Sequence, residues 1–232
     1  METSPPSTTM PTDVLVKQFG AVSFAQTHRD MLELQRQLGT APSGTIEQHR
    51  RETLFLFEPS PVVTLGSAAT SRDILIEEDL LRARGIEIHQ VDRGGEATYH
   101  GPGQLLAYPV FKLSPSERDL HRLLRSLETA VLETLEHWGI EGEREPDHTG
   151  VWVGQHKIAS IGLSVRRWVT GHGLALCVSG DLDPFGWIVP CGLRGCPVTS
   201  MERELGHPPA RGEVEAILAD RMLDLFGRNN LR

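Results

Sequence analysis

The sequence predicts an α+β fold, with helices packed on a mixed or antiparallel β-sheet. Strand-like runs outnumber helical ones, and three of them (151–154, 157–165 and 173–179) follow one another with no helix between. This order excludes a regular alternation of strand and helix, which an all-parallel sheet requires. No internal repeat or domain-splitting linker interrupts the chain, so these elements belong to one domain.

The first half of the chain contains one clear helix among short strands. Residues 24–38 have Met31, Leu34 and Leu38 at helical spacing, and the polar, turn-rich stretch that follows predicts a loop. A second, short helix ends at Gly85. Four strands are predicted around these helices, at 14–20, 53–58, 61–66 and 86–91. A hairpin or a bend joins the second of these strands to the third.

The second half contains the most regular helix, at 116–139. Its apolar residues form one stripe, Ser116 is placed to cap its start, and Gly139 its end. The strand 104–113 precedes this helix, and the amphipathic helix 213–226 closes the chain.

Composition sets limits on location and partners. The 232 residues suffice for one large domain, predicted at 14–232, behind a disordered tail at 1–13. A net charge of −8 argues against nucleic acid as a main partner, and no apolar run approaches the ~20 residues that span a bilayer. Three cysteines and no secretory signal pattern indicate a cytoplasmic location, where structural disulfides are rare.

A glycine-rich segment at 92–104 is the densest chemical signal. Its four glycines allow a backbone to approach a ligand closely and to present amide N–H groups to an anion. The same glycines are also sufficient for a tight connection between two strands. His100 lies within this segment as a structural or a ligand-facing side chain. The pattern matches no nucleotide-binding motif.

Lys157 heads a strand face that is otherwise apolar, shared with Ala159, Ile161 and Leu163. A lysine at a strand end commonly extends its ammonium group into water. A lysine held beside a buried cleft is chemically different, because partial desolvation lowers the pKa of an ammonium group. The sequence leaves both interpretations open.

Cys191 and Cys196 lie five positions apart in a Gly/Pro-rich stretch. They allow a redox-regulated disulfide, a zinc site completed by His207, or a nucleophile at Cys191. A nucleophilic thiol needs a nearby cation to favour its thiolate, and the candidates are Lys157, His100, His172 and Arg194. Cys177, in an alternating apolar run, is predicted to be a small buried side chain.

Taken together and in order, these segments resemble the lipoate-biosynthesis octanoyltransferases, which are octanoyl-acyl carrier protein:protein N-octanoyltransferases. The resemblance rests on RGGEATYHGPGQL (93–105), GVWVG (150–154), KIASIG (157–162), HGLAL (172–176), PFGWIVPCGL (184–193) and VTSM (198–201). It covers roughly residues 14–226. It implies the fold of the biotin and lipoate protein ligase catalytic domain.

The resemblance also implies roles for single residues. Cys191 is the expected acyl acceptor, and Lys157 lowers the pKa of its thiol and moves protons. No metal or cofactor is expected, because the acyl group arrives on the phosphopantetheine of acyl carrier protein. The expected acyl site consists of Arg93, Gly94, Gly95, Glu96, Ala97, Thr98, Tyr99, His100, Ser160, Ile161, Gly162, Gly173, Leu174 and Ala175.

The implied reaction moves octanoyl from octanoyl-acyl carrier protein to lysines of lipoyl domains. The expected acceptors are those of 2-oxoacid dehydrogenase complexes and the glycine cleavage H protein. The sequence departs from the family at Cys177, where Asn is common, and at Cys196, which the family does not require. Two alternatives remain: an ATP-dependent lipoate-protein ligase on the same fold, and a non-catalytic acyl-binding protein regulated by a Cys191–Cys196 redox pair.

Overall fold

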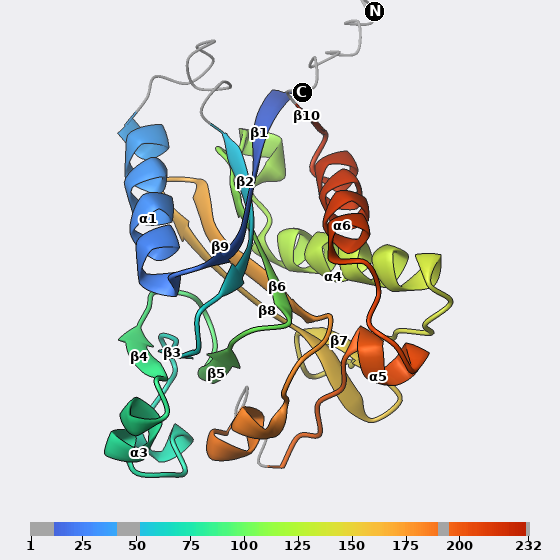
Figure 1. Cartoon of the computed structure of the whole chain (residues 1–232). Helices are drawn as coiled ribbons and strands as arrows, with labels where there is room; N and C mark the ends of the chain where they lie inside the picture. Colours follow the sequence, from blue (N-terminus) through green and yellow to red (C-terminus); the bar gives the residue numbers. More distant parts are fainter. Residues whose placement is uncertain (1–11, 41–51, 190–194, 231–232) are drawn as a thin grey trace, which may run out of the picture.

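A computed structural model of the chain describes residues 12–40, 52–189 and 195–230. Its order of elements is mixed and confirms the predicted α+β class (Figure 1). Cys191, Arg194, most of the predicted tail and most of the predicted loop 39–52 lie outside the described residues. No helix in the described ranges has both the length and the apolar character needed to cross a membrane.

Strands make up the larger share of the elements. The strands are β1 (Thr12–Val22), β2 (Thr53–Pro59), β3 (Val62–Leu65), β4 (Glu87–Gln90), β5 (Ala97–His100), β6 (Gln104–Val110), β7 (Gly150–Val153), β8 (His156–Arg166), β9 (Val169–Cys177) and β10 (Arg228–Asn230). The helices are α1 (Phe24–Thr40), α3 (Glu78–Ala83), α4 (Leu120–His137), α5 (Met201–Leu205) and α6 (Arg211–Leu225).

The strands form two sheets. The large one has seven strands in the order β10-β1-β2-β6-β9-β8-β7, and the small one has three in the order β4-β3-β5. Strand β1 runs parallel to both of its neighbours, whereas the pairs from β2 to β7 are antiparallel. In the small sheet, β3 runs parallel to β4 and antiparallel to β5, so both sheets are mixed.

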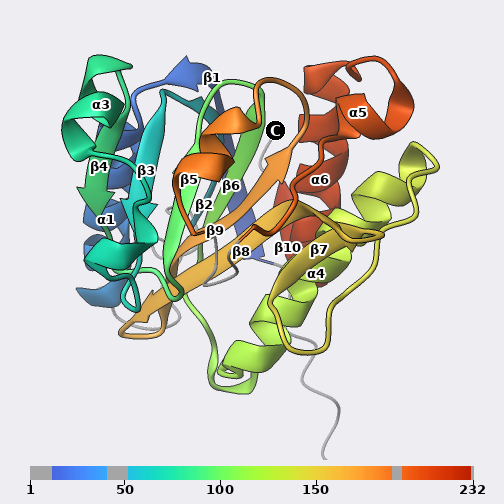
Figure 2. The same cartoon turned by 90° about the horizontal axis from the view of Figure 1, so that it is seen from below.

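Helices cover both faces of the large sheet. Figures 1 and 2 show α1 on one face and the pair α4 and α6 on the other. The α4 side holds the larger apolar core, in which Leu127 and Val131 pack with Leu218 and Met222 of α6. A second core lies under α1, and a third joins the small sheet to the segment 182–188. Cys177 at the end of β9 packs in the third core, so this strand adjoins the small sheet.

The structure corrects two details of the predicted elements. Helix α4 begins four residues later than predicted, because the Asp119 carboxylate, and not Ser116, accepts a hydrogen bond from the N–H of Arg122 at 3.1 Å. Of the two predicted alternatives for the Pro-Ser-Pro connection, a hairpin or a bend, the structure has the bend, because β2 and β3 belong to different sheets. Strand β1 begins at Thr12, inside the predicted tail.

Three short elements were missed by the sequence analysis. Strand β5 lies inside the glycine-rich segment, and β10 and α5 lie near the C-terminal end. Each is only 3–5 residues long, which is too short to show a period in the sequence. Of the three, β5 matters for function, because it carries Thr98 and His100.

Candidate functional site

The loop that follows β4 is held in place by Arg93, which is only 8% exposed. Its guanidinium group donates to the carbonyl oxygens of Thr64 at 2.9 Å, Gly94 at 3.0 Å and Glu96 at 2.9 Å. In return, the N–H groups of Gly66, Ser67 and Ala68 donate to carbonyls of the same loop. Arg93 therefore fixes the shape of the loop, and the predicted glycine-rich segment is rigidly attached to β3.

Most of the predicted acyl-site residues lie around one cavity. Across β8 and β9, Ser160 pairs with Ala175, Ile161 with Leu174 and Gly162 with Gly173. These strand residues face the loop at 93–96 across a small cavity of about 40 Å³. Its lining comprises Arg93, Gly94, Gly95, Glu96, Thr98, His100, Tyr108, Ser160, Ile161, Gly162, Gly173, Leu174 and Ala175.

Two predicted residues lie elsewhere. Strand β5 directs Thr98 and His100 toward the cavity, so the alternation of side chains turns Ala97 and Tyr99 to the opposite face. There they join the third core, where the Tyr99 ring meets Phe185 edge-on with ring centroids 5.6 Å apart. Both residues support the strand that carries the site.

Tyr108 of β6 lines the cavity and was missed by the sequence analysis. It is buried between Phe57 and His172, each of which contacts its ring edge-on. Burial raises the pKa of its hydroxyl, so the group stays neutral. Tyr108 lies in a strand that is buried at every residue. The sequence of this strand therefore did not indicate that one of its faces borders a cavity.

His100 is neutral as well. Complete burial, reinforced by the positive charge of Arg93, lowers the pKa of its imidazole to about 3. Its Nδ1 lies 3.2 Å from the Oε1 of Gln104, whose amide in turn donates to the Tyr99 carbonyl at 3.3 Å. Such a histidine contributes shape and a hydrogen bond to the cavity and carries no charge at neutral pH.

A second, larger cavity of about 420 Å³ adjoins the first and shares five lining residues with it, Gly94, Gly95, Glu96, Ile161 and Gly162. It lies along the edge of β8, because β7 pairs with β8 only as far as Ser160. Helix α4 supplies Leu120 and Leu124, and the rest of the lining is Leu163, Val165, Asp147, His148 and Thr149. Its volume lies within the range of small-molecule pockets.

Gly162 allows the glycine-rich loop to lie against β8. A Cβ at this position would lie 3.0 Å from the carbonyl oxygen of Gly94, which is closer than ordinary contact. The N–H of Gly94 donates to the Leu163 carbonyl at 3.0 Å, so the loop continues the hydrogen bonding of the strand edge. The glycine thus permits the contact from which both cavities are built.

Lys157 is buried, with 3% of its surface exposed, and does not extend into solvent as a strand-end lysine commonly does. Its Nζ donates to the carbonyl oxygen of Thr149 at 3.2 Å and lies 4.7 Å from the centre of the Trp152 ring. Thr149 also lines the larger cavity. The ammonium group is therefore held at the start of β8, beside a pocket, by a carbonyl and an aromatic face.

The backbone of Lys157 holds the segment that follows residues 190–194. Its N–H donates to the Pro197 carbonyl at 2.8 Å, and its carbonyl accepts from the N–H of Thr199 at 3.0 Å. On the other side of residues 190–194, the N–H of Val189 donates to the carbonyl of Asp73 at 2.8 Å. Cys191, the predicted nucleophile, belongs to the stretch between these anchors and lies outside the described residues.

His172 is hydrogen-bonded to Asp92 at the start of the glycine-rich loop and does not line the small cavity. Its Nε2 lies 3.0 Å from the Oδ1 of Asp92, and His172 is 1% exposed. The hydrogen bond from His172 lowers the pKa of Asp92 to about 2, whereas burial lowers the pKa of His172. The pair connects β9 to the loop. His172 directly precedes Gly173, and Asp92 directly precedes Arg93.

Comparisons with known proteins agree with this architecture. Residues 29–223 match the family described as the lipoyl protein ligase A/B catalytic domain. A solved putative lipoate protein ligase from T. acidophilum with bound lipoic acid superposes with a TM-score of 0.73, covering 95% of this chain and 88% of that one. A lipoate-protein ligase A bound with ATP gives a TM-score of 0.71, with 96% and 90% covered. Both are 17% identical to this chain, so they show a shared fold.

Curated relatives are more similar in sequence. An octanoyltransferase of Geobacter metallireducens is 40% identical, with 90% of this chain and 91% of that protein covered. One of Solibacter usitatus is 46% identical, with 80% and 81% covered. Against an octanoyltransferase of Myxococcus xanthus, 43% identical, the match covers 75% of this chain and 51% of that protein. The chain therefore belongs to the lipoyl protein ligase A/B catalytic-domain family, and its octanoyltransferase relatives place it among the acyltransferases of that family.

Proposed function

We propose that the chain transfers an octanoyl group from octanoyl-acyl carrier protein, through a thioester on Cys191, to a lysine of a lipoyl domain. The observation that carries this proposal is the buried ammonium group of Lys157, which donates to the carbonyl of Thr149, a residue that lines the larger cavity. An ammonium group that is held in a buried position next to a pocket can exchange a proton with a molecule bound there, so a buried lysine at such a place indicates a functional group. The similarity to octanoyltransferases is the reason for proposing octanoyl as the acyl group and acyl transfer as the reaction.

The first half of the reaction loads Cys191. Its thiolate, favoured by the positive charge of Lys157, attacks the carbonyl carbon of the incoming thioester. A carbon–sulfur bond forms to Cys191, and the bond to the phosphopantetheine sulfur breaks. The departing thiolate takes a proton from the lysine. One thioester replaces another, so this step needs no other source of energy.

The second half forms the amide. The neutral amine of the acceptor lysine attacks the Cys191 thioester, the carbon–nitrogen bond forms, and the Cys191 thiolate departs. Lys157 accepts the proton that the attacking amine releases, which returns it to its charged state. Because an amide is more stable than a thioester, the sequence of steps proceeds without ATP, a metal ion or a bound cofactor.

The octanoyl chain occupies the larger cavity in this proposal. Leu120, Leu124, Leu163 and Val165 give that end of the cavity an apolar wall. Each methylene group removed from water contributes about 0.8 kcal/mol, so a wall of this kind favours a chain of defined length. The small cavity of about 40 Å³ has too little room for eight carbons and provides a narrow polar approach along His100 and Ser160.

The comparisons also favour a choice of partners. The solved structures of similar fold include a bi-partite archaeal lipoate protein ligase with its E2 lipoyl domain. We therefore take lipoyl domains of 2-oxoacid dehydrogenase complexes and the H protein as acceptors, and a cytoplasmic location where both substrates occur.

The test is transfer without ATP. The full chain is mixed with octanoyl-acyl carrier protein and an apo-lipoyl domain in a nucleotide-free buffer, and the mass of the domain is measured. Octanoylation of the domain supports the proposal. Product that forms only from free octanoate plus ATP identifies an ATP-dependent ligase instead, and the absence of product under both conditions contradicts the proposal.

A further inference from the structure

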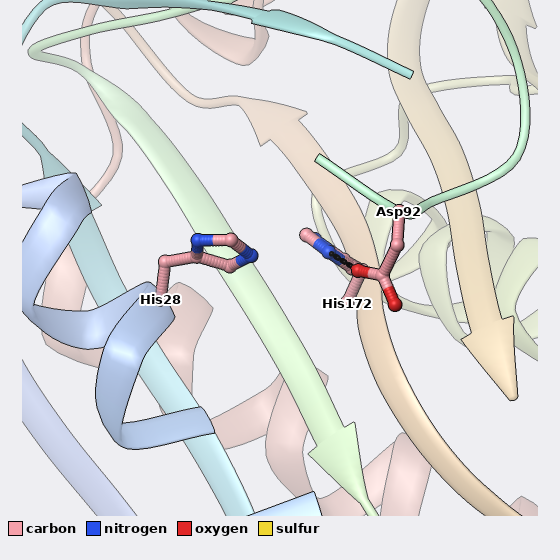
Figure 3. A group of neighbouring side chains, drawn as sticks. All are labelled: His28, Asp92 and His172. Carbon is pink, nitrogen blue, oxygen red and sulfur yellow. Dashed lines mark hydrogen bonds and ion pairs between the residues drawn. The ribbon is translucent and has the colours of Figure 1, made fainter. Parts of the chain in front are cut away.

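Two imidazoles and a carboxylate from three separate elements meet beside the small sheet (Figure 3). His28 comes from α1, Asp92 from the loop after β4, and His172 from β9. One ligand atom from each residue lies within 4.8 Å of the other two. In the described part of the chain, this is the one group of three or more such side chains that is compact enough to hold a metal ion.

The histidines of this group retain unused nitrogen atoms. His172 is 1% exposed, and its Nδ1 has no hydrogen-bond partner among the described residues. The Nε2 of His28 is also buried without a partner in that part of the chain, and Figure 3 shows a ring nitrogen of His28 directed at His172. Buried polar atoms are normally paired, so the unpaired Nε2 of His28, which faces the other two residues, needs an explanation.

We propose that His28, Asp92 and His172 bind one divalent transition-metal ion of the Zn²⁺ class. Two imidazole nitrogens and one carboxylate oxygen suit Zn²⁺, Co²⁺ or Ni²⁺, whereas Mg²⁺ and Ca²⁺ prefer oxygen ligands. Three protein ligands leave a fourth position for water, as in zinc sites of this ligand number.

The distances require little movement. Ligand atoms around a tetrahedral Zn²⁺ lie roughly 3.3 Å apart, given bonds of about 2.0–2.1 Å. The Nε2 of His172 and the Oδ1 of Asp92 already lie 3.0 Å apart. The ligand atom of His28 lies within 4.8 Å of the other two, and a movement of its side chain would close the remaining gap. Arg166 pairs with the other oxygen of Asp92, Oδ2, at 2.9 Å, and the ion would take the place of the proton between the Nε2 of His172 and Oδ1.

Both imidazoles are neutral at neutral pH, as metal ligands must be. Burial, reinforced by the neighbouring His172, lowers the pKa of His28 to about 4. Asp92 stays charged and offsets part of the charge of the ion. Metal binding would fasten α1 to both walls of the small cavity, since Asp92 precedes Arg93 and His172 precedes Gly173.

The test is a titration of Zn²⁺, and separately of Co²⁺, into the full chain after chelator treatment. Accessible thiols are first blocked with N-ethylmaleimide, so that cysteines do not compete for the ion. We expect one ion per chain and the visible absorption of four-coordinate Co²⁺. At an ion concentration about 100 times the Kd, the Tm should rise by roughly 5–10 °C.

His28→Gln is the decisive variant, because His28 lines neither cavity. We expect its affinity to fall at least about 100-fold, since even outer-shell changes cost roughly 10- to 100-fold, while its Tm without metal stays unchanged. His121→Gln, an exposed histidine of α4, is the control and should bind like the unaltered chain. Stoichiometric binding that is equal in His28→Gln, or no saturation at millimolar ion, would overturn the proposal.

Discussion

The buried carboxylate of Glu128 accepts a hydrogen bond of 3.2 Å from the N–H of Gly150, the residue that follows the carbonyl bonded to Lys157. Glu128 is 1% exposed, and its other oxygen is paired with Arg125 at 2.7 Å and Arg144 at 3.0 Å. Helix α4 thereby fixes the strand start against which the Lys157 ammonium rests. Glu128 is a positioning residue for that lysine.

Replacing Glu128 should slow acylation of the enzyme. In Glu128→Ala the N–H of Gly150 loses its acceptor, which costs about 1–3 kcal/mol in the free energy of unfolding. Small displacements of a reacting group reduce rates steeply, so octanoyl-enzyme formation should slow roughly 10- to 100-fold per folded molecule. Rapid-quench mass spectrometry measures this rate, and circular dichroism measures the folded fraction.

Two further variants separate positioning from stability alone. Glu128→Gln keeps an oxygen for Gly150 and should recover most of the rate. Glu133→Ala, which removes a half-exposed carboxylate of the same helix, should leave the rate unchanged. A normal acylation rate in folded Glu128→Ala would show that the carboxylate only stabilises the fold.

Gly150 itself should not tolerate a side chain. Its φ of +144° is rarely adopted by other residues, and a Cβ there would lie 2.7 Å from the Cε of Lys157. Gly150→Ala should therefore displace the lysine and lower kcat more than it raises KM. Gly154→Ala in the adjoining turn, where nothing lies within 4 Å of the added Cβ, is the matched control for a positive φ, here +55°.

Chain-length preference should change when the larger cavity is shortened. Leu124 of α4 lines that cavity, and a phenylalanine there fills part of its volume. Leu124→Phe should reduce transfer of octanoyl more than transfer of butanoyl, because each excluded methylene forfeits about 0.8 kcal/mol. Competition between the two acyl-carrier substrates measures the ratio of octanoyl to butanoyl transfer. An unchanged ratio would mean that the acyl group binds outside this cavity.

Cys177 should resist alkylation in the folded protein. Burial raises the pKa of its thiol from 9.0 to about 12, so its thiolate fraction at pH 8 falls about 1000-fold. Peptide mapping after iodoacetamide treatment should find Cys177 unmodified until the chain is denatured. Rapid labelling of Cys177 under native conditions would mean that β9 opens readily.

The long periodic elements were predictable from the sequence. The helix predicted at 24–38 appears as α1, and the run 157–165 appears within β8, because each shows the period of its structure over many residues. The register of β8 against β9 was not predictable, since it depends on long-range pairing. That register places Gly162 opposite Gly173 and so forms the wall of the small cavity.

The site was predicted in part, for a physical reason. Most of the residues expected at the acyl site do line the small cavity, because they lie on paired positions of β8 and β9 and on the loop that faces them. The burial of Lys157 could not be inferred, because the residues that shield it, Trp152 and Thr149, show no local pattern. The burial of Glu128 could not be inferred either, because nothing in the sequence distinguishes it from the other carboxylates of its helix.

The most direct test of the account is the intact mass of the chain after mixing with octanoyl-acyl carrier protein. We predict a gain of one octanoyl group that hydroxylamine removes, retained in Cys196→Ser, strongly slowed in Lys157→Met and absent in Cys191→Ser. Full-rate transfer to a lipoyl domain by Cys191→Ser would contradict the covalent route and the role given to the buried lysine.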